Sequence, residues 1–229
     1  MLKTIIEKCA SKIKGESYKL DGNLGLLTIF QIALERLRNL LRGICYSRKL
    51  NQRVFVGKHV TIKNRRYLCL GKGVTIGDYV SIDGLSRDGI SIGNNVSIGP
   101  FSILQASGVI SNLGAGLKIG DNSGIGAYSY IGAAGGVSIG QNVIMGQYVS
   151  FHSENHNFSL PDIPIRKQGV TREGIVIEDD CWVGAKVTFL DGAFLSRGCV
   201  VAAGAVVRGV IPPNSVIGGV PAKVIKSRL

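Results

Sequence analysis

Two of the three histidines in the chain, His152 and His156, lie four positions apart within residues 148–158. Histidine titrates close to neutral pH, so it is the side chain best suited to accept a proton from a reacting group. This stretch also interrupts a regular repeat and opens a long irregular segment, and such exits from a rigid scaffold often carry functional residues. We therefore predict a general base here, with His156 favoured over His152.

Composition and charge narrow the possibilities for a chain of 229 residues. The net charge of +12 is compatible with nucleic acid, an anionic membrane face or a phosphorylated ligand as partner. The five cysteines are odd in number and contain no CxxC pair, which favours a reducing compartment and disfavours a disulfide framework or a zinc cluster: Cys9, Cys45, Cys69, Cys181 and Cys199. No signal-peptide pattern and no long apolar run is found, so we expect a cytoplasmic protein that could also contact the inner face of the membrane.

Residues 1–53 differ in composition from the rest and are predicted to form a basic, largely helical N-terminal extension. One apolar set has the spacing of an amphipathic helix: Phe30, Leu34, Leu37 and Leu41. Asn23 is a plausible N-cap and Gly43 a plausible stop. Residues 24–45 could lie on an anionic membrane, or the helix could pack against the domain or another subunit. Periodicity does not separate these two interpretations.

A six-residue repeat occupies residues 54–229. An apolar residue recurs at every sixth position within each group of three: Leu70, Ile76, Ile82; Ile92, Ile98, Leu104; Ile119, Ile125, Ile131; Ile139, Met145, Phe151; and Ile177, Val183, Phe189, Leu195, Val201, Val207. A small or β-branched residue follows most of them four positions later: Val74, Val80, Val96, Ser102, Ser123, Ser129, Val143, Val149, Cys181, Val187, Cys199 and Ala205. Two inward positions per six residues predict a three-sided solenoid of short strands with these side chains in its core.

Gaps in the repeat indicate where the binding face lies. The intervals 82–92, 104–119, 131–139 and 151–177 are all longer than six residues, and each follows the third strand of a coil. Every insertion should therefore leave the solenoid at the same corner, where insertions of this kind are expected to line a binding face. The longest is a loop at 153–174, which begins at the two histidines.

The repeat resembles that of the hexapeptide-repeat acyltransferases. Residues 211–226 are similar to the close of galactoside, maltose and polysaccharide O-acetyltransferases, and residues 179–184 resemble their D-x-x-W-I-G element. The resemblance implies an all-β solenoid, a left-handed parallel β-helix; the repeat itself does not supply the handedness. It further implies acetyl-CoA as acyl donor, a carbohydrate acceptor and a homotrimer with active sites between subunits.

Site residues follow from the same resemblance. The pair Asn155 and His156 is similar to the Asn-His pair of the streptogramin acetyltransferases, while His152 could hold substrate or serve as the base itself, and Glu154 could orient either ring. The residues expected to bind the donor are Trp182, Gly184, Ala185, Ala202, Ala203, Gly204, Lys223 and Lys226. The small residues among them would line a groove for the pantetheine arm of acetyl-CoA, and the lysines would bind its phosphates.

A zinc site and a nucleic-acid partner both fit the sequence less well. Zinc, as in γ-class carbonic anhydrases, needs three histidines, but His59 lies four coils earlier, roughly 19 Å away at about 4.8 Å per strand. No metal is expected.

The aromatic residues other than Trp182 are scattered without a stacking motif, so no nucleic acid is expected. The sequence thus favours an acetyl-CoA-dependent O-acetyltransferase acting on a sugar hydroxyl, in surface polysaccharide biosynthesis. An amino sugar or serine as acceptor, and a non-enzymatic interaction scaffold, remain alternatives.

Overall fold

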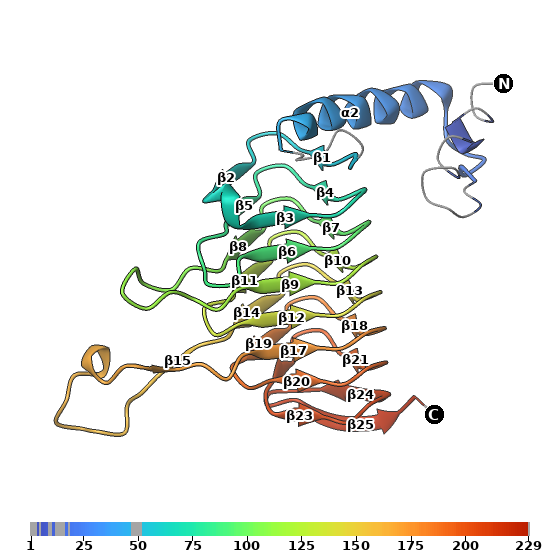
Figure 1. The fold of residues 1–229 in the computed structure, drawn as a ribbon. Helices are drawn as coiled ribbons and strands as arrows, with labels where there is room; N and C mark the ends of the chain where they lie inside the picture. Colours follow the sequence, from blue (N-terminus) through green and yellow to red (C-terminus); the bar gives the residue numbers. More distant parts are fainter. Residues whose placement is uncertain are drawn as a thin grey trace.

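The computed structural model describes residues 4, 6–8, 11, 17, 19–46 and 52–228. Most of the chain winds into a three-sided parallel β-helix, with one sheet on each side (Figure 1). Successive coils contribute one strand to each sheet, so every strand pairs with the strand one coil away. The pairing is parallel throughout the three sheets except between the last two strands of the chain, β24 and β25. This is the solenoid that the six-residue repeat predicts.

The strands are short, and we name the sheets A, B and C. Sheet A contains β1 (Phe55–Val56), β4 (Thr75–Ile76), β7 (Ser97–Ile98), β10 (Gly124–Ile125), β13 (Ile144–Met145), β18 (Trp182–Val183), β21 (Val200–Val201), β24 (Ser215–Gly218) and β25 (Lys223–Ser227). Sheet B contains β2 (Thr61–Lys63), β5 (Ser81–Asp83), β8 (Ile103–Gln105), β11 (Tyr130–Gly132), β14 (Ser150–His152), β19 (Thr188–Leu190) and β22 (Val206–Val207). Sheet C contains β3 (Leu68–Leu70), β6 (Ile90–Ile92), β9 (Leu117–Ile119), β12 (Val137–Ile139), β17 (Ile175–Ile177), β20 (Phe194–Leu195) and β23 (Val210–Ile211).

The core consists of the two inward positions of the repeat. All the apolar and small residues predicted to point inward are buried. Phe151 stacks on Phe189 of the next coil, with ring centroids 4.8 Å apart. Burial of each large aliphatic side chain contributes about 1.5–3 kcal/mol, so the ladder holds the coils together. Cys181 and Cys199 lie in the small inward slots, as predicted, whereas Cys45 and Cys69 are exposed; Cys9 lies outside the described residues.

An aromatic ladder runs along the corner between sheets A and B. Its five rings stack on one another with centroids 4.8–5.1 Å apart: His59, Tyr79, Phe101, Tyr128 and Tyr148. Each takes a left-handed backbone conformation, with φ between 54° and 59°, which is uncommon for aromatic residues. Stacking between successive coils compensates for this conformation. The expectation that these aromatic residues are scattered is therefore wrong, because each directly precedes a small inward residue.

The insertions leave the solenoid between sheets B and C, which confirms the prediction of one shared corner. The longest was expected to be irregular, but part of it is regular. It contains the antiparallel hairpin of β15 (Asn155–His156) and β16 (Val170–Thr171), and a short 3-10 helix η2 (Ile165–Lys167). A second 3-10 helix, η1 (Arg65–Tyr67), lies at the same corner in the first coil. The hairpin projects from the solenoid (Figure 1).

Helix α2 (Leu26–Ile44) lies across the first coil and contacts β1 (Figure 1). The amphipathic helix is confirmed, but two details differ from the prediction. The N-cap is Gly25 rather than Asn23. Gly43 does not end the helix: it is buried in its last turn, where a side chain would collide with the Val54 carbonyl. Glycine is needed there because helix and strand approach too closely for a Cβ atom.

Candidate active site

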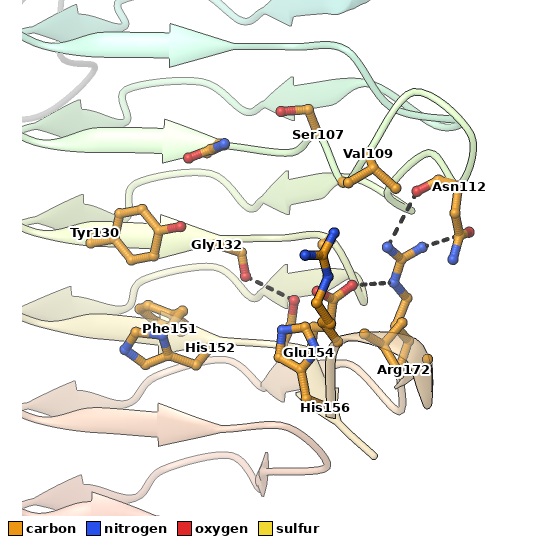
Figure 2. Close-up of a pocket in the computed structure, with 17 residues that line it drawn as sticks. Ser107, Val109, Asn112, Tyr130, Gly132, Phe151, His152, Glu154, His156 and Arg172 are labelled. Carbon is orange, nitrogen blue, oxygen red and sulfur yellow. Dashed lines mark hydrogen bonds and ion pairs between the residues drawn. The ribbon is translucent and has the colours of Figure 1, made fainter. Parts of the chain in front are cut away.

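A cavity of about 490 Å³ lies where two of the inserted loops meet the outer face of sheet B. Its walls come from β8, β11 and β14, from the loop 106–116 and from the segment 153–172. The polar side chains of its lining are Gln105, Ser107, Asn112, Tyr130, His152, Ser153, Glu154, His156, Arg166 and Arg172, and most of them are labelled in Figure 2. The prediction that the insertions line a binding face agrees with this arrangement, since both loops contribute to one cavity.

His152 reaches the cavity from the end of β14. Because side chains of a strand alternate, Phe151 points into the core and His152 points outward. Its ring lies 5.8 Å from the Tyr130 ring on the neighbouring strand β11, tilted by 37°. In Figure 2 the two side chains lie close together over sheet B.

His156 reaches the same cavity from the hairpin. It lies on β15, opposite Val170 on β16, and is exposed. Figure 2 places it nearer than His152 to Arg172. Within the described part of the chain, neither imidazole has a hydrogen-bond partner, so both have ring nitrogens available to a ligand.

The base of the hairpin is fixed by Ser153, which is 1% exposed. Its hydroxyl donates to the Gly132 carbonyl at 2.8 Å and accepts from the Gly135 amide at 2.9 Å. The other arm is held by Asp191, whose carboxylate accepts from the amides of Glu173 and Gly174 at 2.8–3.1 Å. A buried and paired hydroxyl such as that of Ser153 favours one conformation, so the hairpin starts from a rigid point only three residues before His156.

Arg172 connects the two loops. Its Nε donates to Glu154 at 2.6 Å, and the two side chains are 13% and 27% exposed. The same guanidinium donates to the Asn112 side chain at 3.0 Å and to the Leu113 carbonyl at 3.1 Å. Glu154 therefore pairs with Arg172 and not with either imidazole, which corrects the suggestion that it orients a histidine.

Arg166 lines the cavity from η2. The loop around it is held by Gln168, whose side chain bonds the backbone of Leu160 and Ile163 at 2.7–3.0 Å. Among the described residues, Arg166 has no acidic partner, whereas Arg172 is neutralised by Glu154. The cavity therefore presents two histidines and one uncompensated cation to its contents.

Of the predicted catalytic residues, Asn155 is not brought into the cavity. It precedes His156 on β15, so its side chain points to the opposite face of the strand. Its backbone pairs with Thr171, and it is exposed. His59 lies in the aromatic ladder at the corner between sheets A and B, away from the other two histidines.

The predicted donor-binding residues lie on another part of the surface. Trp182 is on β18 of sheet A and 57% exposed. The predicted small residues follow it at the corner between sheets A and B: Gly184, Ala185, Ala202, Ala203 and Gly204. Lys223 and Lys226 are exposed on β25. None of these eight residues lines the histidine cavity, so one chain does not bring the two predicted groups together.

Comparison with known proteins agrees with this architecture. The family model described as the hexapeptide repeat of succinyl-transferase matches residues 116–146 and 174–208. These two segments therefore carry hexapeptide repeats similar to those of that family. A solved structure of the N-acyltransferase AntD from Bacillus cereus, in complex with an amino sugar nucleotide and coenzyme A, has a TM-score of 0.53 and 24% identity, covering 76% of this chain and 85% of AntD. The chain thus has the left-handed parallel β-helix fold of this class.

Several curated relatives match about 40% of the chain or less. A Mycobacterium tuberculosis protein named a probable acetyltransferase is 39% identical over 92 residues, covering 40% of this chain and 31% of the relative. WbbJ of Escherichia coli, provisionally named a lipopolysaccharide biosynthesis O-acetyl transferase, is 39% identical over 97 residues, covering 39% and 50%. A Staphylococcus aureus N-acetyltransferase is 46% identical over 52 residues, covering 23% and 22%. The chain spans half or less of the length of each of these relatives.

Sequence reasoning missed Tyr130, Arg166 and Arg172 as parts of the site. Tyr130 could have been found, because it precedes the inward Ile131 and must face outward from sheet B. The two arginines lie in a loop without repeat phase, so no periodicity points to them. Their roles depend on how two loops fold against each other.

Proposed function

We propose that this protein is an acetyl-CoA-dependent O-acetyltransferase that acetylates a sugar hydroxyl. The observation that carries the proposal is the cavity in which His152 and His156 meet on a hexapeptide-repeat solenoid. An alcohol has a pKa far above neutral and attacks a thioester poorly until its proton is removed, and histidine is suited to remove it. No other described cavity wall of the chain contains two histidines.

Both imidazoles are exposed and have no competing partner among the described residues. His156 is our choice of base because its pair with Asn155 resembles the Asn-His pair of the streptogramin acetyltransferases. It would take the proton from the acceptor hydroxyl as the oxygen attacks the thioester carbonyl. The oxyanion then collapses, the carbon–sulfur bond breaks, and protonated His156 returns the proton to the departing thiolate. His152, beside Tyr130, would hold the acceptor sugar, whose ring can pack on an aromatic face. Of the backbone amides of residues 182–185, those of Trp182 and Gly184 already donate to the Cys199 and Val201 carbonyls, so the Ala185 amide is the candidate oxyanion donor.

The donor site would be completed by a second copy of the chain. Trp182 and the small residues that follow it lie on sheet A and its corner, not at the histidine cavity of their own chain. Trp182 and its neighbour Ile144 are 57% and 64% exposed, an apolar surface that another subunit could cover. A homotrimer with the histidines of one subunit facing the Trp182 region of the next is consistent with both observations. Lys223 and Lys226 would meet the coenzyme A phosphates.

The acceptor proposed is a carbohydrate precursor of a surface polysaccharide, handled in the cytoplasm. The partial match to WbbJ supports this class. We assign catalysis to residues 54–229, and regard residues 1–53 as an N-terminal extension outside the catalytic domain. No resident metal is proposed, since the chemistry requires only the histidine and backbone donors.

Thiol release from acetyl-CoA, measured against a panel of sugars, amino sugars and serine, tests this assignment. Turnover with a neutral or acidic sugar, and mass spectrometry that locates the acetyl group on oxygen, would support it. Turnover only with an amino sugar would assign an N-acetyltransferase, and turnover only with serine would assign a different O-acetyltransferase. No turnover with any acceptor, by protein that binds acetyl-CoA poorly, would favour an interaction scaffold.

A further inference from the structure

Helix α2 exposes a continuous apolar stripe that none of the described residues covers. The spacing between successive residues of the stripe alternates between three and four positions, so their side chains lie on one side of the helix. These residues are Leu27, Phe30, Leu34, Leu37, Leu41 and Ile44. Five of the six are between 52% and 71% exposed, and Leu34 is partly exposed. Soluble proteins rarely leave so many neighbouring large apolar side chains in water unless the surface binds something.

The helix is held on the solenoid by a different side. Ile29 and Gly43 are its buried residues. Arg36 stacks on the Phe55 ring, with its guanidinium carbon 4.2 Å from the centroid, and bonds the Thr75 hydroxyl at 3.2 Å. Arg42 donates to the Val56 carbonyl at 3.4 Å. These contacts fix the rotation of the helix about its axis, so the stripe faces away from β1 and is exposed among the described residues.

The surface around this helix is strongly basic. Within residues 19–46 and 52–67 there are nine basic and two acidic side chains, a net charge of +7. The basic residues are Lys19, Arg36, Arg38, Arg42, Arg53, Lys58, Lys63, Arg65 and Arg66, and the acidic ones are Asp21 and Glu35. More than half of the charge of the whole chain, +12, is thus concentrated at this end of the solenoid.

We propose that the apolar stripe of α2 docks this end of the protein onto an anionic lipid surface. A basic helix with an apolar side inserts that side between lipid headgroups, and each nearby Lys or Arg adds electrostatic attraction. A second copy of the chain is a poorer occupant, because an isologous contact would bring two surfaces of charge +7 together. Within the described residues, no helix combines the length and apolarity needed to cross a bilayer, so α2 would lie along the interface.

Vesicle co-sedimentation of the full chain tests the proposal. The fraction of wild-type protein bound is measured on phosphatidylcholine vesicles with and without phosphatidylglycerol. Two double variants that change the net charge by the same amount are measured in the same way. Phe30→Glu with Leu37→Glu alters the stripe, whereas Thr28→Glu with Gln31→Glu alters exposed positions of the same helix outside it. All four positions are exposed, so both variants should fold. Circular dichroism and size-exclusion chromatography check this.

Wild type should bind only the vesicles that contain phosphatidylglycerol. The stripe variant should bind at least about tenfold more weakly than the control variant, because only it loses apolar insertion as well as charge. Equal loss in both variants, or no binding by wild type, would overturn the proposal. A smaller assembly for the stripe variant in the absence of lipid would instead assign the stripe to a contact between copies. None of these readouts depends on acyl transfer, so the test of lipid binding by α2 is independent of the test of the proposed function.

Discussion

The Glu154 carboxylate accepts a hydrogen bond from Arg172 Nε at 2.6 Å, across the base of the hairpin that carries His156. The same guanidinium reaches Asn112 and Leu113 of the other loop. One side chain therefore sets the distance between the two loops that form the cavity. If the cavity is the acceptor site, its shape depends on this contact although neither residue needs to take part in proton transfer.

Arg172→Ala should impair acceptor use far more than folding. Loss of the guanidinium leaves Glu154 without its partner, at a local cost of about 1–3 kcal/mol, while the solenoid core is untouched. We expect a raised acceptor KM and faster proteolysis within residues 157–169, with a melting temperature close to that of wild type. Arg172→Lys keeps the charge but not the fork of donors and should rescue only in part. Unchanged kinetics in Arg172→Ala would mean that the two loops do not need to be connected.

Arg166→Gln tests whether the uncompensated cation in the cavity contacts the acceptor. We expect the KM of the acceptor to rise about tenfold or more, as for loss of one charged hydrogen bond, and kcat to change less. Lys167→Gln is the matched control, because Lys167 is the next residue of η2, carries the same charge and does not line the cavity. Equal effects of the two changes would indicate general electrostatics and not a direct contact.

The intersubunit arrangement can be tested by complementation. His156→Ala and Trp182→Ala chains are first shown to be nearly inactive alone and are then co-expressed in equal amounts. If each site takes His156 from one subunit and Trp182 from its neighbour, every mixed trimer contains one intact site. Three quarters of random trimers are mixed, so about a quarter of wild-type activity should return. No recovery, with mixed assemblies confirmed by mass spectrometry, would place both residues in the same subunit's site.

Buried thiols give the chain a specific alkaline sensitivity. Burial raises the pKa of Cys181 to about 11 from an ordinary 9.0, and burial also raises the pKa of Cys199. The unfolded chain therefore loses these protons first, and stability should fall as pH rises from about 9 through about 11. Cys181→Val with Cys199→Val should lose less stability in this window. Valine occupies the equivalent slots at Val96 and Val143, so the variant should be close to wild type at pH 7.

Denaturant unfolding at pH 7, 9 and 10.5 measures that difference. Lysines and tyrosines titrate in both proteins, so only the difference between the variant and wild type is informative. A gap between the two stability curves that stays constant from pH 7 to pH 10.5 would contradict the assignment of the loss to the thiols.

Much of the fold could be predicted because the same two inward positions recur in every six-residue repeat. Phe151 is inward and His152 outward simply by strand alternation, and the shared corner of the insertions follows from phase. The aromatic ladder was predictable in principle, since Tyr79 and Tyr128 occupy the same place in their coils. By contrast, Arg172 pairs with Glu154, 18 residues away, and with Asn112, 60 residues away. These contacts depend on how the two loops fold against each other. No local pattern encodes such contacts.

Gly43 illustrates a different limit. A glycine at the end of an apolar helical pattern normally marks a stop, but here it allows α2 to lie against Val54. Both roles need the absence of a side chain, so the residue type alone does not decide between them. The position of the first coil relative to α2 decides which of the two roles Gly43 has.

The most direct test of the account is acetyl transfer by His156→Ala, with His152→Ala as its partner. Thiol release is measured with acetyl-CoA and an acceptor confirmed for wild type, and acetyl-CoA binding is measured in parallel. We predict that His156→Ala lowers kcat by at least about a hundredfold with donor affinity unchanged, while His152→Ala mainly raises the acceptor KM. Full turnover by His156→Ala would contradict the assignment of the base, and loss of turnover by His152→Ala alone would transfer that role to His152.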